Sequence, residues 1–270
     1  MSLYDLIVKP IARKMDLERA SKVGLRYFQL IGKMPFGRAL NRWIHGNRPV
    51  GLQREVFGLN FYNPLGLGAG LDIHGELYND LNNLGFSFVE IGPMNADGVR
   101  RAIRHLQTDP QDDILALCIS GDYLTSFTLA YDFCDFFVID LTEDPSTEEI
   151  NPLLESRLNE QEYKPIVIKL PDYLNDSELD TIADFCLMNS VDGIELRSNT
   201  QVSHVHEHTA GRLPIIANCH IDSPEQAAEA LSCGASLVEL RTGLLREGPG
   251  IVSRTLKYLL NKKNESTGSK

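Results

Sequence analysis

The fold is decided near the C-terminus, where the sequence runs Ile215-Ile216-Ala217-Asn218-Cys219-His220-Ile221-Asp222-Ser223-Pro224 and, after a helical segment, Ala235-Ser236-Leu237-Val238-Glu239-Leu240-Arg241-Thr242-Gly243. Each half is a short apolar run that ends in small or polar residues. Ser223 is predicted to cap a helix, with Pro224 at its first position and Gln226 completing a capping box. The pattern predicts parallel βα units, and two such units near the end of a barrel usually build its phosphate site.

The same unit recurs outward from this stretch. Apolar runs end near Gly68, Gly92, Ser120, Leu141, Lys169, Arg197, Asn218 and Arg241. Segments of helical composition lie between and after them, at residues 75–84, 95–106, 122–134, 146–161, 175–189, 201–209, 223–233 and 248–260. About eight such units in roughly 200 residues predict a (β/α)8 TIM barrel. A doubly wound open sheet is disfavoured because its Gly-x-Gly-x-x-Gly turn is missing after the first strand.

Three parts of the chain are expected. Residues 1–50 form a helical segment, residues 51–262 the barrel, and residues 263–270 a polar tail that frays. In the first part, Pro10 is expected to divide the helices. Such helices could pack against the barrel, cap it, form an interface or contact a membrane surface. Residues 56–61 are predicted to form a short strand, as one arm of a hairpin.

Composition restricts the partners of the protein. Among 270 residues, 43% are hydrophobic and 23% charged, which is typical of a globular protein with a large core. The formal net charge is −11 without a basic cluster, so nucleic acid is not an expected partner. Five scattered cysteines indicate a reducing compartment, and hence a cytoplasmic protein. No apolar run reaches membrane-spanning length, so an expected membrane contact would be peripheral, at the inner face, through the N-terminal helices.

Charged residues are expected at the C-terminal ends of the strands, where barrels of this kind carry their chemistry. They are Asp72, Glu90, Asp140, Glu143, Lys169, Glu195, Arg197, His220, Glu239 and Arg241. Because an isolated buried charge is very costly, these side chains are expected to pair with one another. The expected partner of Lys169 is Asp140 or Glu195, on the neighbouring strands.

Several longer segments carry a family resemblance. They are Phe57-Gly58-Leu59-Asn60-Phe61-Tyr62-Asn63-Pro64-Leu65-Gly66-Leu67-Gly68-Ala69-Gly70-Leu71-Asp72, residues 85–92, Lys169 with Pro171-Asp172, residues 211–216 and residues 234–249. Together they closely resemble class 2, quinone-linked dihydroorotate dehydrogenases over nearly the whole chain. The resemblance implies an FMN-binding barrel of pyrimidine biosynthesis that oxidises dihydroorotate and passes the electrons to quinone. The positions it assigns to the cofactor are Gly68, Ala69, Gly70, Lys169, Asn218, His220, Arg241, Thr242 and Gly243.

The positions that carry the family's chemistry depart from its pattern. Ile73 stands where the family has a lysine, and Glu143, beside Thr142, stands where it has the serine base. The phosphate-binding Gly-Val-Gly-Gly is replaced by Ala217-Asn218-Cys219-His220. The family's glycines let backbone N–H groups reach a phosphate, whereas the side chains here occupy that space.

Three hypotheses about function follow. The favoured one is a degenerate relative with impaired or lost FMN binding and dihydroorotate oxidation, in a small-molecule, regulatory or partner-binding role. The alternative is an active FMN-dependent dihydroorotate oxidoreductase that uses Glu143 as its base, with a pKa raised by burial. A metal-dependent enzyme on the same barrel is the third. A small anion is expected near Asn218, His220, Arg241, Thr242 and Gly243, unless Arg241 turns inward and pairs with Glu195 or Glu239.

No metal site is predicted from the histidines. His204, His206 and His208 would share one face of an extended segment, but the second shell that a zinc site needs is not visible in the sequence. A solvated segment is therefore the favoured interpretation. Cys219 and His220 are disfavoured as a nucleophile pair because adjacent residues on a strand point in opposite directions.

Overall fold

The computed structural model describes residues 48–111 and 113–268, together with residues 23, 24, 26, 28–30, 43 and 46. Within the predicted N-terminal helical segment, residues 23, 24, 26, 28–30 and 43 are helical, and Phe28 is buried in the main core. The predicted division at Pro10 and the predicted membrane contact lie outside the described residues. Among the described helices, none has both the length and the apolar character that a membrane span requires.

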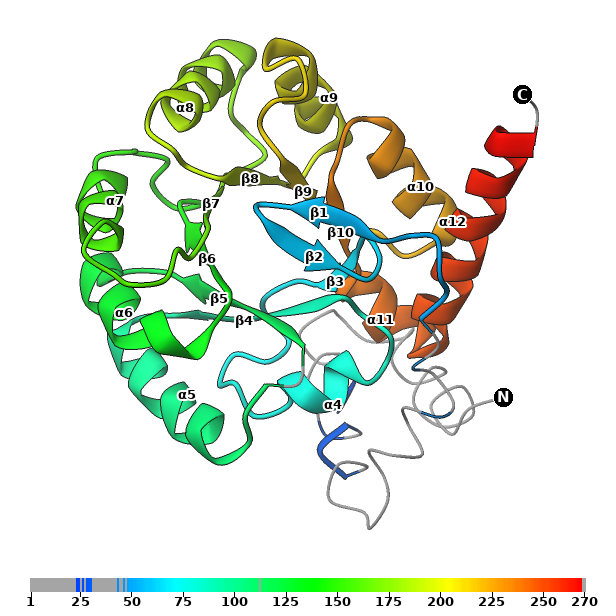
Figure 1. The fold of residues 1–270 in the computed structure, drawn as a ribbon, viewed down its shortest axis with the longest axis horizontal. Helices are drawn as coiled ribbons and strands as arrows, with labels where there is room; N and C mark the ends of the chain where they lie inside the picture. The colour runs from blue at the N-terminus through cyan, green and yellow to red at the C-terminus, as the bar shows by residue number, and fades with distance from the viewer. Residues whose placement is uncertain are drawn as a thin grey trace.

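Eight parallel strands close into a barrel surrounded by helices (Figure 1). They are β3 (Leu65–Leu67), β4 (Phe88–Met94), β5 (Ile114–Ile119), β6 (Phe136–Asp140), β7 (Ile166–Lys169), β8 (Gly193–Leu196), β9 (Ile215–Ala217) and β10 (Leu237–Glu239). Each strand pairs with its neighbour in chain order, and β10 closes the barrel by pairing with β3. The predicted (β/α)8 barrel is confirmed. The strands are apolar on both faces because one face lines the barrel and helices cover the other.

The helices follow the predicted rhythm. They are α4 (Tyr78–Asn82), α5 (Ala96–Thr108), α6 (Tyr123–Ala130), the 3-10 turn η2 (Tyr131–Phe133), α7 (Ile150–Arg157), α8 (Asp176–Met188), α9 (Asn199–His208), α10 (Pro224–Ser232), α11 (Arg241–Glu247) and α12 (Gly250–Gly268). Residues 263–268 continue α12 instead of forming the predicted frayed tail. Lys263 ties this end to the barrel, because its Nζ donates to the Gly51 carbonyl oxygen at 2.6 Å.

A hairpin lies across the N-terminal end of the barrel (Figure 1). It consists of β1 (Arg54–Val56) and β2 (Leu59–Phe61), so the single strand predicted over residues 56–61 is instead a turn and the second arm. Phe57 and Gly58 both have positive φ, as this tight turn requires. The Phe61 ring packs 5.6 Å from that of Phe88, and Phe57 lies 5.9 Å from Phe136. Aromatic packing thus fills this end and leaves the opposite end for polar residues.

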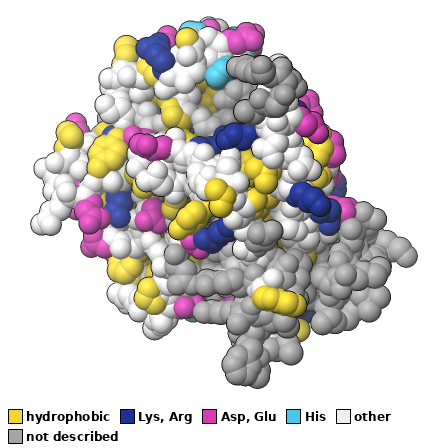
Figure 2. Space-filling view, turned by 45° about the vertical axis from the view of Figure 1, so that its right-hand side comes forward, with side chains coloured by type: hydrophobic (Ala, Val, Ile, Leu, Met, Phe, Trp, Pro, Cys, Tyr) yellow, Lys and Arg dark blue, Asp and Glu magenta, His cyan; other side chains and the backbone are white. Residues whose placement is uncertain are grey.

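The surface carries charges of both signs. Lys and Arg side chains are interspersed with Asp and Glu on the face drawn in Figure 2. This mixture accompanies the formal net charge of −11. On this face the positive side chains do not gather into one extended patch, and the expectation about nucleic acid stays a prediction.

The N-terminus of α10 has the predicted cap. The Ser223 hydroxyl accepts a hydrogen bond from the Gln226 N–H at 3.3 Å, and Pro224 occupies the first helical position. The return bond of the predicted capping box is shifted by one residue, because Gln226 Oε1 accepts from the Asp222 N–H at 2.8 Å. Cap and helix together orient the turn after β9.

Ser223→Ala is expected to lower the free energy of unfolding by about 1 kcal/mol, because it leaves an N–H of the first turn without its acceptor. For a domain of this size, the loss corresponds to a fall in Tm of about 2–4 °C. Thermal and urea unfolding measure it. Ser232→Ala, at the exposed end of the same helix, is the matched control and should change stability by less than about 0.5 kcal/mol. Equal losses in both variants would contradict the assignment of the cap.

Candidate functional site

Four charged side chains from different strands meet inside the C-terminal end of the barrel. Side chains alternate along a strand, so those of one parity line the barrel interior. Glu90 on β4, Lys169 on β7, Glu195 on β8 and Glu239 on β10 occupy such positions and are between 0% and 7% exposed. Lys169 and Glu195 are register partners on adjacent strands. The fold therefore brings three carboxylates and one ammonium together inside the barrel.

Lys169 forms the salt bridge that was expected with Glu195. Its Nζ lies 2.7 Å from Glu195 Oε1 and 3.5 Å from Glu90 Oε1. Burial by itself lowers the pKa of Lys169, but the Glu195 and Glu90 carboxylates raise that pKa well above its usual value. Lys169 is therefore an ammonium. Asp140, the other expected partner, accepts instead from the N–H and hydroxyl of Thr142, at 3.0 and 2.6 Å.

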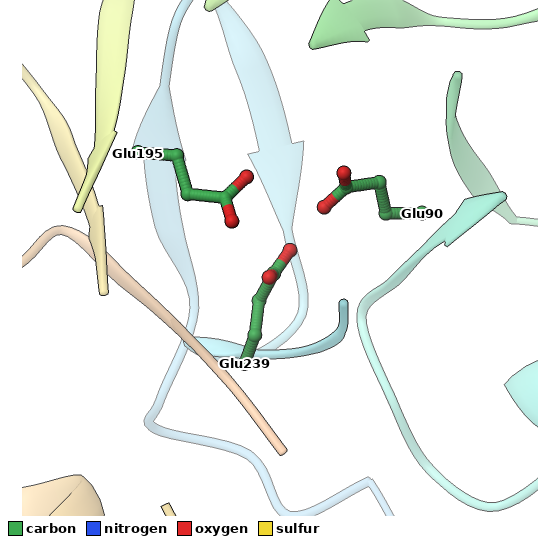
Figure 3. A group of neighbouring side chains, drawn as sticks. All are labelled: Glu90, Glu195 and Glu239. Carbon is green, nitrogen blue, oxygen red and sulfur yellow. The ribbon is translucent and has the colours of Figure 1, made fainter. Parts of the chain in front are cut away.

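The three carboxylates point toward one another (Figure 3). One ligand atom from each of Glu90, Glu195 and Glu239 lies within 4.8 Å of the other two. Asn218 Nδ2 donates to Glu195 Oε1 at 2.9 Å. Burial and then the charges of Glu195 and Glu90 raise the pKa of Glu239 well above its usual value, and burial and Glu90 raise the pKa of Glu195 to about 7. The cluster contains more negative charge than one lysine balances.

The side chains of Glu239, from the cluster, and Arg241, two residues further on, cover the glycine-rich strip Gly68-Ala69-Gly70. Glu239 Oε2 lies 2.3 Å from the point that a Cβ on Gly68 would occupy, and Arg241 Nη1 lies 2.5 Å from the corresponding point on Gly70. Arg241 Nη1 also donates to the Ala69 carbonyl oxygen at 3.0 Å. The absence of side chains at these glycines therefore accommodates a carboxylate and a guanidinium of the chain itself.

In the predicted phosphate site, two backbone N–H groups already donate to carbonyl oxygens of the chain. The Asn218 N–H donates to the Leu196 carbonyl oxygen at 2.8 Å, and the Gly243 N–H donates to that of Ile221 at 3.1 Å. His220 is exposed, with a φ of 53°. Arg241 is half-buried, but its hydrogen bond goes to Ala69 rather than to Glu195 or Glu239. The anion expected near Arg241, His220 and Thr242 stays a prediction.

The candidate base Glu143 lies outside the carboxylate cluster. Its side chain is exposed, whereas the alternative hypothesis expects a buried base. Thr142 beside it is half-buried and donates to Asp140. Ile73, which replaces the family lysine, is 43% exposed. The structure thus separates Glu143 and Thr142 from the buried charges around Lys169.

The three histidines lie on helix α9 and do not share one face. His204 Nε2 lies 2.8 Å from Asp180 Oδ1 on α8, and His208 Nδ1 lies 3.0 Å from the same oxygen. His206 packs instead against Gly234. The helix agrees with the helical composition of residues 201–209, and the face that the three histidines would share in an extended segment does not form, because residues two apart lie on opposite sides of a helix. His204 is half-buried and His208 exposed, and both lie beside carboxylates of α8.

In the sequence, Glu90, Glu195 and Glu239 stand out only as strand-end charges that need partners. They are far apart in the sequence and belong to no local motif. A signal was nevertheless present, because each is a glutamate within an apolar strand: Val89-Glu90-Ile91, Ile194-Glu195-Leu196 and Val238-Glu239-Leu240. Glutamate is almost never fully buried unless it is paired, so three such glutamates in barrel strands indicate a common site.

Comparison with known proteins gives a consistent family. A family model described as dihydroorotate dehydrogenase matches residues 192–262, which include both runs quoted first above. A protein of Christiangramia forsetii named dihydroorotate dehydrogenase (quinone) is 24% identical over 344 aligned residues, covering 96% of this chain and 99% of the relative. A protein of Vibrio atlanticus with the same name is 26% identical over 331 residues, covering 91% and 97%. Both alignments exceed the 270 residues of this chain, so the relatives contain segments that it lacks.

Solved structures show the same fold. A ligand-free dihydroorotate dehydrogenase of Eimeria tenella superposes with a TM-score of 0.70 at 19% identity, covering 85% of this chain and 94% of that one. The enzyme of the same organism in complex with ferulenol superposes with a TM-score of 0.69, also at 19% identity, covering 86% and 92%.

Proposed function

We propose that this chain, which belongs to the class 2 dihydroorotate dehydrogenase family of pyrimidine biosynthesis, is a degenerate member that has lost FMN binding and dihydroorotate oxidation. The main support for the proposal is that side chains of the protein itself cover the strip Gly68-Ala69-Gly70. The resemblance assigns the surface of Gly68-Ala69-Gly70 to the flavin, but Glu239 and Arg241 lie against that surface. A flavin ring and these two side chains cannot occupy the same space. The residues present therefore do not fit FMN.

Charge supports the same proposal. The resemblance places Lys169 beside the flavin, but here the lysine is bound to Glu195 at 2.7 Å and faces Glu90 at 3.5 Å. If Lys169 moved toward a cofactor, the buried carboxylates would lose the one cation that contacts them among the described residues. Leaving one partner of a buried ion pair alone typically costs about 3–5 kcal/mol. The cluster thus opposes the movement that would free Lys169.

The phosphate end supports it as well. Phosphate sites rely on backbone N–H groups that are free to point at the anion. The N–H groups of Asn218 and Gly243 already donate to carbonyl oxygens at 2.8 and 3.1 Å. The role that remains is a binding one, for a small molecule or a partner protein, and we propose a small anion as a ligand of the rim near His220, Arg241 and Thr242. There, side chains would supply the contacts that backbone supplies in the family.

The purified protein is expected to be colourless and to take up no FMN. The measurements are the visible absorption spectrum after purification and the quenching of FMN fluorescence on titration with the protein. The Vibrio atlanticus relative, prepared in parallel, serves as the positive control. A stoichiometric yellow complex with this chain would refute the loss of FMN binding. It would also direct attention to the alternative, an active oxidoreductase with Glu143 as its base.

A further inference from the structure

We propose that this barrel binds a divalent cation between Glu90 in β4, Glu195 in β8 and Glu239 at the end of β10. The inference goes beyond the proposed loss of flavin chemistry. Its test measures cation binding, whereas the loss of FMN binding is measured by flavin absorption, so the two can fail independently.

The geometry is that of a ligand set built on rigid elements. The three carboxylates come from three separate strands, and each is at most 1% exposed. One ligand atom from each lies within 4.8 Å of the other two. A cation equidistant from three oxygens that lie 4.8 Å apart would be about 2.8 Å from each, and oxygens about 4.0–4.5 Å apart bring that distance into the range of Ca²⁺–oxygen bonds, about 2.3–2.6 Å. Oxygens closer together than the limit would suit smaller ions such as Mn²⁺.

Unpartnered oxygens point into the same space. Glu239 is 1% exposed, and neither of its carboxylate oxygens accepts from an N–H group of the described residues, although the Glu90 carboxyl group is within hydrogen-bonding reach when one of the two groups is protonated. Glu90 Oε2 and Glu195 Oε2 likewise accept from no N–H group there, because Lys169 contacts only the Oε1 atom of each. In Figure 3 the Glu239 carboxylate points between the other two. Buried polar atoms are nearly always satisfied, so these oxygens indicate a missing ligand.

The charge of the cluster defines the class of ligand. Three ionised carboxylates and the Lys169 ammonium have a formal charge of −2, which one divalent cation neutralises. Two protons would neutralise the cluster equally, so the cation competes with protons for the carboxylates. Since all the ligand atoms are carboxylate oxygens, the site favours hard ions such as Mg²⁺, Mn²⁺ or Ca²⁺ over ions that prefer sulfur or nitrogen ligands.

The local backbone makes room for this arrangement. Gly68 has no side chain, and a Cβ there would lie 2.3 Å from Glu239 Oε2. The Asn218 amide donates to Glu195 Oε1 at 2.9 Å, the same oxygen that Lys169 contacts. Gly68 and Asn218, which the resemblance assigned to a flavin, thus position two of the three carboxylates.

Binding of Mn²⁺ to the full-length protein tests the proposal. After treatment with EDTA and dialysis, Mn²⁺ is titrated while the paramagnetic resonance signal of free Mn²⁺ is recorded. One Mn²⁺ per chain is expected to disappear from that signal. At a cation concentration a hundred times Kd, the Tm should rise by about 5–10 °C. Parallel unfolding curves in Mg²⁺ and Ca²⁺ rank the ions, and metal analysis of the protein as purified identifies the one it acquires in the cell.

Two variants locate the site. Glu239→Gln keeps the size of the side chain but removes one ligand charge, and it is expected to weaken Mn²⁺ binding at least 10-fold and to abolish the Tm rise. Glu160→Gln makes the same chemical change at an exposed position and should bind Mn²⁺ like the unmodified protein. Circular dichroism verifies that both variants are folded.

Two results would overturn the proposal. One is the absence of saturable Mn²⁺ binding, or of any Tm rise with the three cations, in the unmodified protein. The other is a folded Glu239→Gln variant that binds Mn²⁺ as tightly as the Glu160→Gln control. In either case, protons rather than a cation would neutralise the cluster.

Discussion

Dihydroorotate is expected to reduce neither a quinone nor a dye in the presence of this protein above the rate of a control without enzyme, even with excess FMN. Loss of a positioned general base alone lowers rates by about 10²–10⁴-fold. Here the residue at the base position is exposed, and Glu239 and Arg241 cover the glycine strip. Turnover at least about 10³-fold below that of the Vibrio atlanticus relative is therefore expected. Reduction of the dye, followed by absorbance, measures it.

Measurable turnover would revive the alternative base. In that case Glu143→Gln should abolish the activity, while Glu148→Gln, at an exposed position a few residues further on, should leave it unchanged. Activity that survives Glu143→Gln would exclude Glu143 as the base and would contradict both the loss of function and this alternative.

The barrel could be predicted because its information is local and repeated. Each unit has a short apolar run, a turn and a helix, and α10 even shows the predicted serine cap and proline. Even the weak helical pattern over residues 201–209 forms α9. The prediction failed at residues 56–61, where the single strand conceals a turn at Phe57 and Gly58. A positive φ at a phenylalanine is not visible in composition.

The buried cluster was harder to predict because its members are far apart in the sequence. Glu90, Lys169, Glu195 and Glu239 meet only through closure of the barrel and strand register. Resemblance to the family indicated which positions should bind a cofactor, but not that Arg241 would lie over Gly70 or that Glu239 would lie against Gly68. Such contacts depend on side-chain rotamers and on competition between charges for one lysine. Neither is encoded in a local pattern.

Replacing Lys169 with methionine is expected to cause the largest loss of stability of any change considered for this barrel. Methionine keeps the volume but removes the cation, leaving Glu90, Glu195 and Glu239 buried together. Breaking a buried ion pair in this way costs about 3–5 kcal/mol, or roughly 10 °C in Tm for a chain of this size. Urea unfolding in EDTA at pH 8 measures the loss. Lys257→Met, on the exposed side of α12, is the control and should change stability by less than about 0.5 kcal/mol.

The stability lost in Lys169→Met should depend on pH, and the direction of this dependence distinguishes charge balance from packing as the cause. Burial and then Glu90 raise the pKa of Glu195 from 4.5 to about 7, against the opposing effect of Lys169. A carboxyl group whose pKa is raised on folding contributes stability below its unfolded pKa, and this contribution disappears as the pH rises through the folded value. Without the lysine, the carboxyl groups should remain protonated to higher pH, so the deficit of Lys169→Met should be greatest near pH 8 and shrink toward pH 5. Adding Glu195→Gln to Lys169→Met should restore part of the stability at pH 8, since one uncompensated charge is removed. A deficit that is independent of pH and unchanged in the double variant would mean that Lys169 contributes packing rather than charge balance.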